Sequence, residues 1–597
     1  MDLLPKVFRT EGDVVDFDPS KIFNSIVKET GMNEEDARKI TELVVRRIIS
    51  SGMKFLSGPH IREIVCSILS ENHFEQERKL YTRIGMPLMD YEEILEKGLL
   101  GGKVGITNPE RIHHRAANQL AEEYTLLRIL DNDESQAHLY GDIHIHQLKY
   151  FDLRPHEQIW DPRIILENGL PPSNNLLSTC KAGPPKTLRS AVELLSNWLS
   201  IIQTEFSGTQ GLEYLTIFLA PYARGLSHDE IKRDIKTLIY NINFNSNASG
   251  RLFVKSSINC IPSIIPELKN LQIKGSKILE SNVYGEFAEE CLKVFDIISE
   301  VFLDGDYNGR AFDIPKYIVY LNREWLDIHS NSYKKIIEEI ITHQTPFLAN
   351  HEISKKLIHK KDQSANYISH GILQKISLNL PRYAFISKQD DGKFFEILER
   401  NVNLCFNILE KKFKVIKERI NTGKLPLCAS KIDGKLIYNL EDQILGISFV
   451  GLNEAVKLIT GLEIHDENGA LDFGIKILTR LSDLCVQEHE KRGLNYSLVE
   501  GSSGRAINRF LRLDSKHFPN INLKEYSDSA HFRSDISIEP EKRVKIRSKF
   551  HELVKIGAIE QINLKQLSDK GNYRKFIENL MQLSFIKNDL ACLKFND

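Results

Sequence analysis

Short apolar stretches alternate with amphipathic helices through most of this chain, and this alternation constrains its fold more than any other feature. Helical periodicity marks the segments 187–206, 227–245, 281–303, 333–343, 390–420, 452–461 and 465–492. Between them lie apolar stretches that we expect to be strands: Leu215–Leu219, Tyr317–Leu321, Ile376–Leu380 and Ile447–Val450. Strands that alternate with helices predict an α/β fold.

The composition is that of an ordinary globular protein. The 597 residues contain 41% hydrophobic and 27% charged side chains. A net charge of −2 gives no electrostatic reason to expect binding to nucleic acid or to a membrane. Because no long apolar run and no signal-peptide core occur, we expect a cytoplasmic protein.

The cysteines do not form a metal-binding pattern. No C-x-x-C pair occurs, so zinc-ribbon and iron–sulfur sites are not expected, and we expect no bound metal. Most of the thiols lie in apolar helical contexts, which favours buried free cysteines. The eight cysteines are Cys66, Cys180, Cys260, Cys291, Cys405, Cys428, Cys485 and Cys592.

Four parts are expected along the chain. Residues 1–98 read as a small α+β unit, with a strand hairpin followed by helices, the first of which starts at Asp18-Pro19. Residues 99–109 are glycine-rich and predict a linker. Residues 110–560 form the large α/β domain, and residues 561–597 form a short C-terminal tail.

The segment Gly141–Leu170 carries two imidazoles on one face of a short alternating run, typical of a half-buried strand. His144 and His146 could contribute to a metal site, but zinc or iron needs three or four ligands. We favour a hydrogen-bonded structural pair.

The same segment resembles the anaerobic, glycyl-radical (class III) ribonucleoside-triphosphate reductases of archaeal type. The resemblance continues in family order over roughly residues 6–560. It implies a ten-stranded α/β barrel. The matching segments include Gly183–Lys186, Gly208–Gly211, Leu219–Tyr222, Gly371–Gln374, Leu378–Arg382, Gly451–Ala455 and Ser529–Phe532.

Residues 1–98 resemble the ATP-cone, the allosteric nucleotide module of ribonucleotide reductases. The resemblance implies that ATP or dATP binds as an effector, with Arg9, Lys21, Ser57 and Arg83 at the site. Cationic side chains and the free N–H groups of a helix start near Pro59 suit phosphate binding. The alternative is a solvated basic face on a small helical domain.

The resemblance also implies residues that this chain lacks. The family uses a cysteine directly after the Arg-Pro-x of the first segment, and that position is Glu157 here. A thiyl cysteine is expected on the loop before Leu378, but no cysteine occurs between Cys291 and Cys405. The expected C-terminal glycyl-radical motif and four-cysteine zinc site are not found, since Gly571 lies in a different context.

One further loop, Glu500–Arg505, is rich in small residues and precedes a helix. Backbone N–H groups and hydroxyls at Ser502, Ser503 and Gly504 could hold a substrate phosphate. A plain capped turn is the alternative.

We therefore predict a ribonucleoside-triphosphate reductase-like protein that binds nucleotides without radical catalysis of its own. One alternative is an active formate- or thiol-dependent reductase subunit completed by a separate glycyl-radical chain, and another is a nucleotide-binding regulator of a true reductase. The partners expected are nucleotides, a radical-SAM activase or a true reductase subunit, and further copies of the chain in a homo-oligomer.

Overall fold

The structure is a computed structural model, and it divides the chain into two compact units. The first comprises residues 1–107 and 112–135, and the second residues 108–111 and 136–597. The described residues are 6–8, 14–52, 55–86, 88–97, 109–173, 180–245, 254–275, 282–322, 325–326, 331–358, 367–466, 469–501, 504–518, 524–554, 556–564 and 573–596.

The first unit combines a small sheet with helices. Strands β1 (Lys6–Phe8), β2 (Val14–Asp16) and β3 (Phe55–Ser57) form a sheet in the order β2-β1-β3. As predicted, the first helix starts after Asp18, whose side chain accepts a hydrogen bond from the backbone N–H of Ser20 at 3.0 Å. The helices are α1 (Pro19–Thr30), α2 (Glu34–Ser51), α3 (Gly58–Glu71), α4 (Glu75–Tyr81), α5 (Leu88–Lys97), α6 (Pro109–Tyr124) and the π-helix η1 (Thr125–Ile129).

Most of α6 and all of η1 belong to this first unit, whereas the sequence placed them at the start of the large domain. Two polar contacts tie α6 and Asn132, shortly after η1, to the segment around α4. The ammonium group of Lys79 donates to Asn132 Oδ1, and the backbone N–H of Gly85 donates to Glu123 Oε2 at 2.9 Å. These contacts join residues far apart in the sequence, which is why periodicity could not reveal the boundary.

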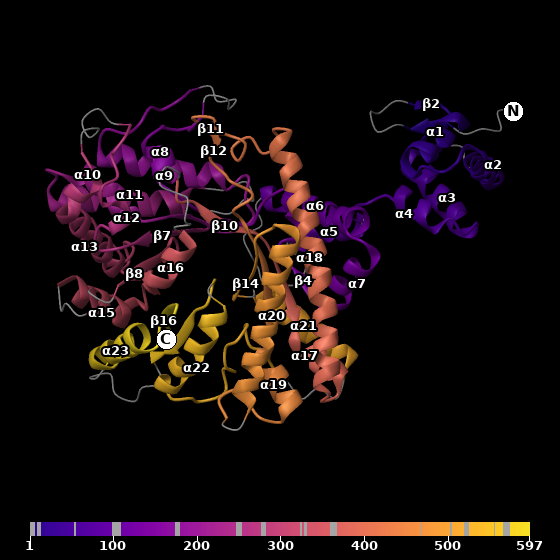
Figure 1. Ribbon diagram of the computed structural model, residues 1–597. Coiled ribbons are helices and arrows are strands. Elements are labelled where there is room, and N and C mark those ends of the chain that lie inside the picture. The colour runs from indigo at the N-terminus through magenta and orange to yellow at the C-terminus, as the bar shows by residue number, and fades with distance from the viewer. Residues whose placement is uncertain are drawn as a thin grey trace. The chain divides into compact units, whose positions relative to one another are not determined.

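The second unit is built on a closed barrel (Figure 1). Its described sheet has eleven strands, of which β4 pairs only with β10, and the other ten run β14-β13-β10-β5-β6-β7-β8-β9-β16-β15. The two ends of this row meet through a parallel bridge between Val499 and Ile556. The strands are β4 (Ile143–Ile145), β5 (Glu157–Trp160), β6 (Gln210–Leu212), β7 (Ser256–Cys260), β8 (Lys316–Leu321), β9 (Phe347–Asn350), β10 (His370–Asn379), β13 (Ile444–Val450), β14 (Tyr496–Leu498), β15 (Glu560–Asn563) and β16 (Cys592–Asn596).

The barrel consists of two halves of opposite direction. Strands β5 to β9 are parallel to one another, and so are the neighbours β10, β13 and β14 and the pair β15 and β16. The halves meet antiparallel where β10 pairs with β5 and where β16 pairs with β9. This architecture confirms the predicted ten-stranded α/β barrel.

Helices cover the outer face of the barrel, as Figure 1 shows for α9, α11 and α13. None of the described helices is long and apolar enough to span a bilayer. Strands β11 (Lys431–Ile432) and β12 (Lys435–Leu436) form a separate small hairpin. The helices are α7 (Asn132–Tyr140), η2 (Leu148–Tyr150), α8 (Arg163–Leu166), α9 (Leu188–Ile202), α10 (Leu215–Ala223), α11 (His228–Phe244), α12 (Pro266–Lys269), η3 (Tyr284–Phe287), α13 (Ala288–Asp304), α15 (Asn331–His343), α16 (His351–Ile358), α17 (Leu380–Ser387), α18 (Asp391–Asn421), α19 (Leu452–Thr460), α20 (Ala470–Arg492), α21 (Gly504–His517), α22 (Pro540–Leu553), α23 (Tyr573–Gln582) and η6 (Leu583–Lys587).

Three predictions about single elements differ from the structure. The stretch Leu215–Leu219 was expected to be a strand, but it opens α10, whose residues are all buried. A helix that is apolar all round has the same sequence appearance as a buried strand. Strand β4 was expected to be half-buried but is buried throughout. Residues 561–597 are not a separate tail, because β16 lies in the barrel between β9 and β15.

Candidate functional site in the barrel

The inner face of the barrel keeps access to solvent. On β5, Glu157 and Ile159 are partly exposed, whereas Gln158 and Trp160 are buried. The Trp160 ring packs edge-on against Trp198 of the outer helix α9, with 5.2 Å between ring centroids. Successive strand residues point to opposite faces, so Glu157 and Ile159 point into the barrel.

Glu157 is an ionised carboxylate on this inner face. Burial raises the pKa of its carboxyl group, but His156, Lys375 and the backbone N–H of Thr209 lower it by more, so that the pKa lies below its usual value. The side chain is 33% exposed, and its Oε1 lies 3.6 Å from His156 Nε2. The carboxylate is therefore charged at neutral pH.

A second group of polar side chains gathers at the carboxyl ends of the neighbouring parallel strands. Glu213 directly follows β6, Asn259 lies on β7 and Tyr320 on β8, while His370 begins β10. Glu213 Oε2 accepts hydrogen bonds from Asn259 Nδ2 at 3.0 Å and pairs with His370 Nε2 at 3.0 Å. Asn259 Nδ2 also donates to the Tyr320 hydroxyl at 3.1 Å. Ligand sites of α/β proteins characteristically lie at such strand ends.

Among the residues that the structure describes, several polar atoms of this group have no hydrogen-bond partner. They are Glu213 Oε1, Asn259 Oδ1 and the hydroxyl of the nearby Ser257, and all three residues are at most 3% exposed. Leaving a buried polar group unpaired costs on the order of 1–3 kcal/mol. A bound water or a ligand with hydrogen-bond donors would satisfy these atoms, which makes the inner face a candidate binding site.

A buried ion pair fixes the chain just before β10. Arg163 Nη2 lies 2.5 Å from Asp161 Oδ2, and the same carboxylate accepts from the backbone N–H of Ile368 at 2.9 Å. The backbone N–H of Asp161 donates to the hydroxyl of Ser369 at 3.0 Å. The connection between β9 and β10 is thereby anchored beside His370.

The comparison with protein families decides what this barrel is. The family model of anaerobic ribonucleoside-triphosphate reductase matches residues 104–593. This chain belongs to that family. The match covers every barrel strand except the last three residues of β16, and it explains why the resemblance appeared as an ordered set of segments.

Curated reductases are similar over nearly the whole chain. The anaerobic ribonucleoside-triphosphate reductase of Salmonella typhimurium is 22% identical, over 96% of this chain and 88% of its own length. That of Escherichia coli is 22% identical, over 94% of this chain and 84% of its own length.

Solved structures of the Thermotoga maritima anaerobic ribonucleotide reductase share the fold. The structure with glycerol in the active site matches with a TM-score of 0.71 at 18% identity, covering 85% of each chain. The structure with dATP bound in the specificity site matches with a TM-score of 0.68 at 17% identity, covering 85% of this chain and 87% of that chain.

The structure describes only some of the residues that were predicted to bind the effector nucleotide. Lys21 lies exposed in the first turn of α1, and Arg83 lies exposed after α4. Ser57 ends β3, and Arg9 lies outside the described residues. Within the described part of the chain, no hydrogen bond or ion pair joins Lys21 to Arg83, so their joint role stays a prediction.

The predicted phosphate loop is also partly described. Ser502 and Ser503 lie outside the described residues, and Gly504 begins α21. The preceding Gly501 is anchored on both sides, since its N–H donates to the Ser529 hydroxyl at 3.1 Å and its carbonyl accepts from Lys375 Nζ. Lys375 thus binds this loop through the Gly501 carbonyl, and its positive charge also acts on the carboxylate of Glu157.

No cysteine occupies the positions implied for radical chemistry, but one thiol that the sequence did not single out points into the barrel. Cys592 pairs with Ala349 of β9 and lies on the partly exposed face of β16. Burial raises the pKa of its thiol to about 12. Cys260 and Cys291 are buried, and burial raises the pKa of both thiols.

The His144 and His146 pair is buried and uncharged at neutral pH. Burial lowers the pKa of His144 to about 3 and that of His146 well below its usual value. His146 Nε2 lies 2.7 Å from the Ser377 hydroxyl, whereas His144 Nδ1 has no hydrogen-bond partner among the described residues, so the predicted hydrogen bonding is seen for His146 alone. No cluster of three or more potential metal ligands occurs within the described residues.

Sequence reasoning missed the Glu213, Asn259 and His370 group. Glu213 closely follows the Gly208–Gly211 segment and His370 directly precedes Gly371, so both adjoin segments that carried the resemblance. Their convergence depends on strand pairing, which sequence spacing alone does not supply.

Proposed function

We propose that this chain is a nucleotide-binding member of the reductase family that does not itself carry out radical reduction. The observation that carries the proposal is the ionised carboxylate of Glu157 on the inner face of the barrel, at the position where the resemblance implies a family cysteine. A carboxylate has no S–H bond, so it cannot donate a hydrogen atom to a ribose radical.

The loop before β10 supports the same proposal. No cysteine occurs between Cys291 and Cys405, so the loop has no thiol from which a thiyl radical could form. Cys592 enters the barrel from β16, a different strand, and lies at neither position where the resemblance implies a family cysteine.

Regulation by nucleotides is the second part of the proposal. The first unit would bind ATP or dATP as an effector, with Lys21 and Arg83 supplying positive charge to the phosphates. The structural relative from Thermotoga maritima has dATP in its specificity site, which makes dATP a reasonable first ligand to test. A homo-oligomer or a complex with a true reductase, located in the cytoplasm, would be the working form.

A second candidate function is that of a reductase subunit completed by another chain that supplies the glycyl radical. The unpartnered inner atoms Glu213 Oε1 and Asn259 Oδ1 favour it, because a retained substrate site would use such groups. The two candidates differ in whether deoxynucleotide product can ever form.

The deciding experiment is an anaerobic assay of the purified chain with a radical-SAM activase, S-adenosylmethionine, formate or dithiol, and each ribonucleoside triphosphate. We expect no deoxynucleotide by chromatography and no glycyl-radical doublet by electron paramagnetic resonance, while a family member with both cysteines gives both signals in parallel. Glu157→Cys alone should restore nothing, because the loop thiol is still missing. Product from the wild-type chain would refute the proposal, and product only after addition of a second chain would establish the alternative.

A further inference from the structure

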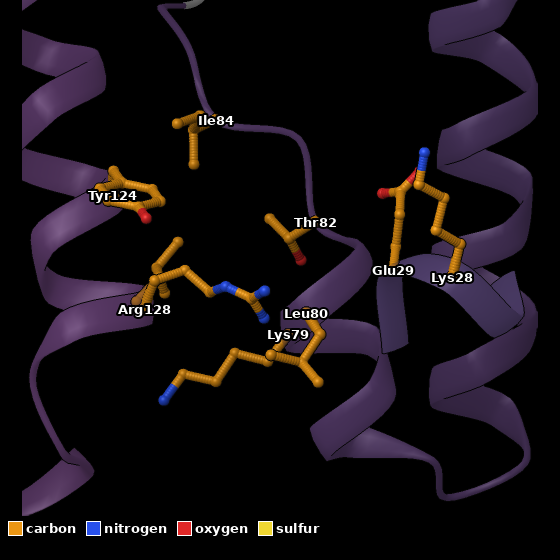
Figure 2. Close-up of a pocket in the computed structure, with 9 residues that line it drawn as sticks. Lys28, Glu29, Lys79, Leu80, Thr82, Ile84, Tyr124 and Arg128 are labelled. Carbon is orange, nitrogen blue, oxygen red and sulfur yellow. The ribbon is translucent and has the colours of Figure 1, made fainter. Parts of the chain in front are cut away.

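The first unit contains a cleft of about 350 Å³ between the C-terminal parts of α1 and α4 on one side and α6 with η1 on the other. Figure 2 shows Tyr124 and Arg128 on one side of this cleft, which we call the α4–η1 cleft, and Lys28 with Glu29 on the other. The volume is in the range of small-molecule sites.

Two contacts hold the walls of the α4–η1 cleft together. Lys79, which lines the cleft, donates to Asn132 Oδ1 just beyond η1. The backbone N–H of Gly85 donates to Glu123 Oε2 at 2.9 Å, one residue before Tyr124. The cleft is therefore a fixed part of the unit.

The charge of the cleft is positive and mostly uncompensated. Its acidic residue, Glu29, is bound through both oxygens by Arg62, with Nη1–Oε2 at 2.7 Å and Nη2–Oε1 at 2.9 Å. The hydrogen bond from Arg62 lowers the pKa of Glu29. Across the described residues, neither the Lys28 ammonium group nor the Arg128 guanidinium takes part in a hydrogen bond or an ion pair with a side chain. Both are thus available to an anionic ligand.

Apart from Thr82, the remaining lining of the cleft is apolar and aromatic. Leu80, Ile84 and Leu127 line it together with Tyr124, whose side chain is 43% exposed. Leu127 and Arg128 lie on the π-helix η1, an uncommon element that often occurs at functional sites. In Figure 2 the guanidinium of Arg128 extends across the cleft toward Thr82.

We propose that the α4–η1 cleft binds a polyphosphate chain, either free or carried by a nucleoside. Arg128 and Lys28 would contact the phosphate oxygens from opposite walls, with Lys79 adding positive charge. Where a nucleoside is attached, the exposed Tyr124 ring would stack on the base.

This site is separate from the one proposed around Lys21. Lys21 and Lys28 lie in the first and last turns of α1, seven residues apart (28 − 21), which corresponds to about 10 Å along the helix. Polyphosphate binding in the α4–η1 cleft requires neither radical chemistry nor the effector site of the cone.

Isothermal titration of the full-length chain with sodium tripolyphosphate tests the proposal. The double variant Lys28→Ala/Arg128→Ala should bind at least about tenfold more weakly, because two charge-assisted contacts are removed. Arg46→Ala is the matched control, since Arg46 is an exposed arginine on α2 whose partner Glu42 lies 3.8 Å away, and its affinity should equal that of the wild type. Arg128→Lys should recover part of the loss, and circular dichroism should show that every variant is folded.

The source of the polyphosphate is distinguished in a Lys21→Ala background, where the cone site is weakened. One outcome is that ATP binds more tightly than tripolyphosphate and that Tyr124→Ala lowers the affinity for ATP to that for tripolyphosphate. The ligand is then a nucleotide. If the two bind alike and Tyr124→Ala changes neither, the ligand is a free polyphosphate. Tripolyphosphate binding by the double variant at wild-type affinity, or no binding by the wild type, would overturn the proposal.

Discussion

At the scale of one residue, the proposed function rests on Glu157, a carboxylate at the position where the family resemblance implies a cysteine. The carboxylate lies among positive charges from Lys375 and Lys255, and these contribute to keeping its pKa below the usual value although burial opposes them. The inner face thus holds a fixed negative charge where a neutral thiol is implied. Such a charge near a triphosphate would disfavour substrate binding unless a cation or a lysine intervenes.

The lowered pKa of Glu157 predicts a specific dependence of stability on pH. Its charged form stabilises the fold above the unfolded-state pKa of about 4.3, and this contribution is lost as the pH falls through the lower folded-state pKa. The difference in unfolding free energy between wild type and Glu157→Gln should therefore shrink between neutral pH and acid. Urea denaturation followed by tryptophan fluorescence measures it, because all three tryptophans, Trp160, Trp198 and Trp325, lie in the barrel unit. If the difference in unfolding free energy between the two proteins grew in acid, the lowered pKa of Glu157 would be contradicted.

At the scale of elements, a single buried lysine fixes the chain that leads into β5. Lys412 of α18 is fully buried, and its ammonium group donates to the carbonyls of Tyr150 at 3.0 Å, Phe151 at 2.6 Å and Arg154 at 2.6 Å. Burial lowers the pKa of this lysine well below its usual value. The turn before Glu157 thus takes its position from a helix that lies more than two hundred residues later in the sequence.

Replacing Lys412 by methionine should destabilise the barrel by about 3–5 kcal/mol, because three carbonyl groups lose their donor. Lys414→Met is the matched control on the same helix. Lys414 is 69% exposed and forms an i,i+4 pair with Glu410, so its loss should cost about 0.5 kcal/mol or less. The midpoint of urea denaturation compares the two variants. Equal effects would show that the buried hydrogen bonds contribute little.

The elements also show what the sequence could and could not predict. Strands β8, β10 and β13 were predicted because short apolar runs lie between clear helices. The helix α10 was missed because an all-buried segment has no amphipathic period. The pairing of Glu213 with His370 was missed for another reason, since it joins the end of one strand to the start of another 157 residues later.

At the scale of the whole molecule, closure of the barrel depends on the last part of the chain. Arg547 of α22 is fully buried and binds Glu500, which follows β14, at 2.7 Å and Glu560 of β15 at 3.0 Å. The Val499–Ile556 bridge lies between these two strands. The family resemblance predicted a ten-stranded barrel, but it ended the barrel at residue 560, because β16 follows a segment that carries no family motif.

The division into two units predicts where the chain can be cut. A fragment of residues 136–597 should be soluble and monodisperse, with the tryptophan emission of the full chain, because it keeps the barrel strands together. A fragment of residues 100–597 retains α6 and η1 but loses α4, and with it the contacts of Lys79 with Asn132 and of Gly85 with Glu123. Its apolar cleft lining at Leu127 would then be exposed, so it should bind more of a hydrophobic dye and aggregate more readily. Size-exclusion chromatography with light scattering compares the two fragments at equal concentration. If the longer fragment proved the better behaved, α6 and η1 would belong energetically with the barrel, as the sequence had placed them.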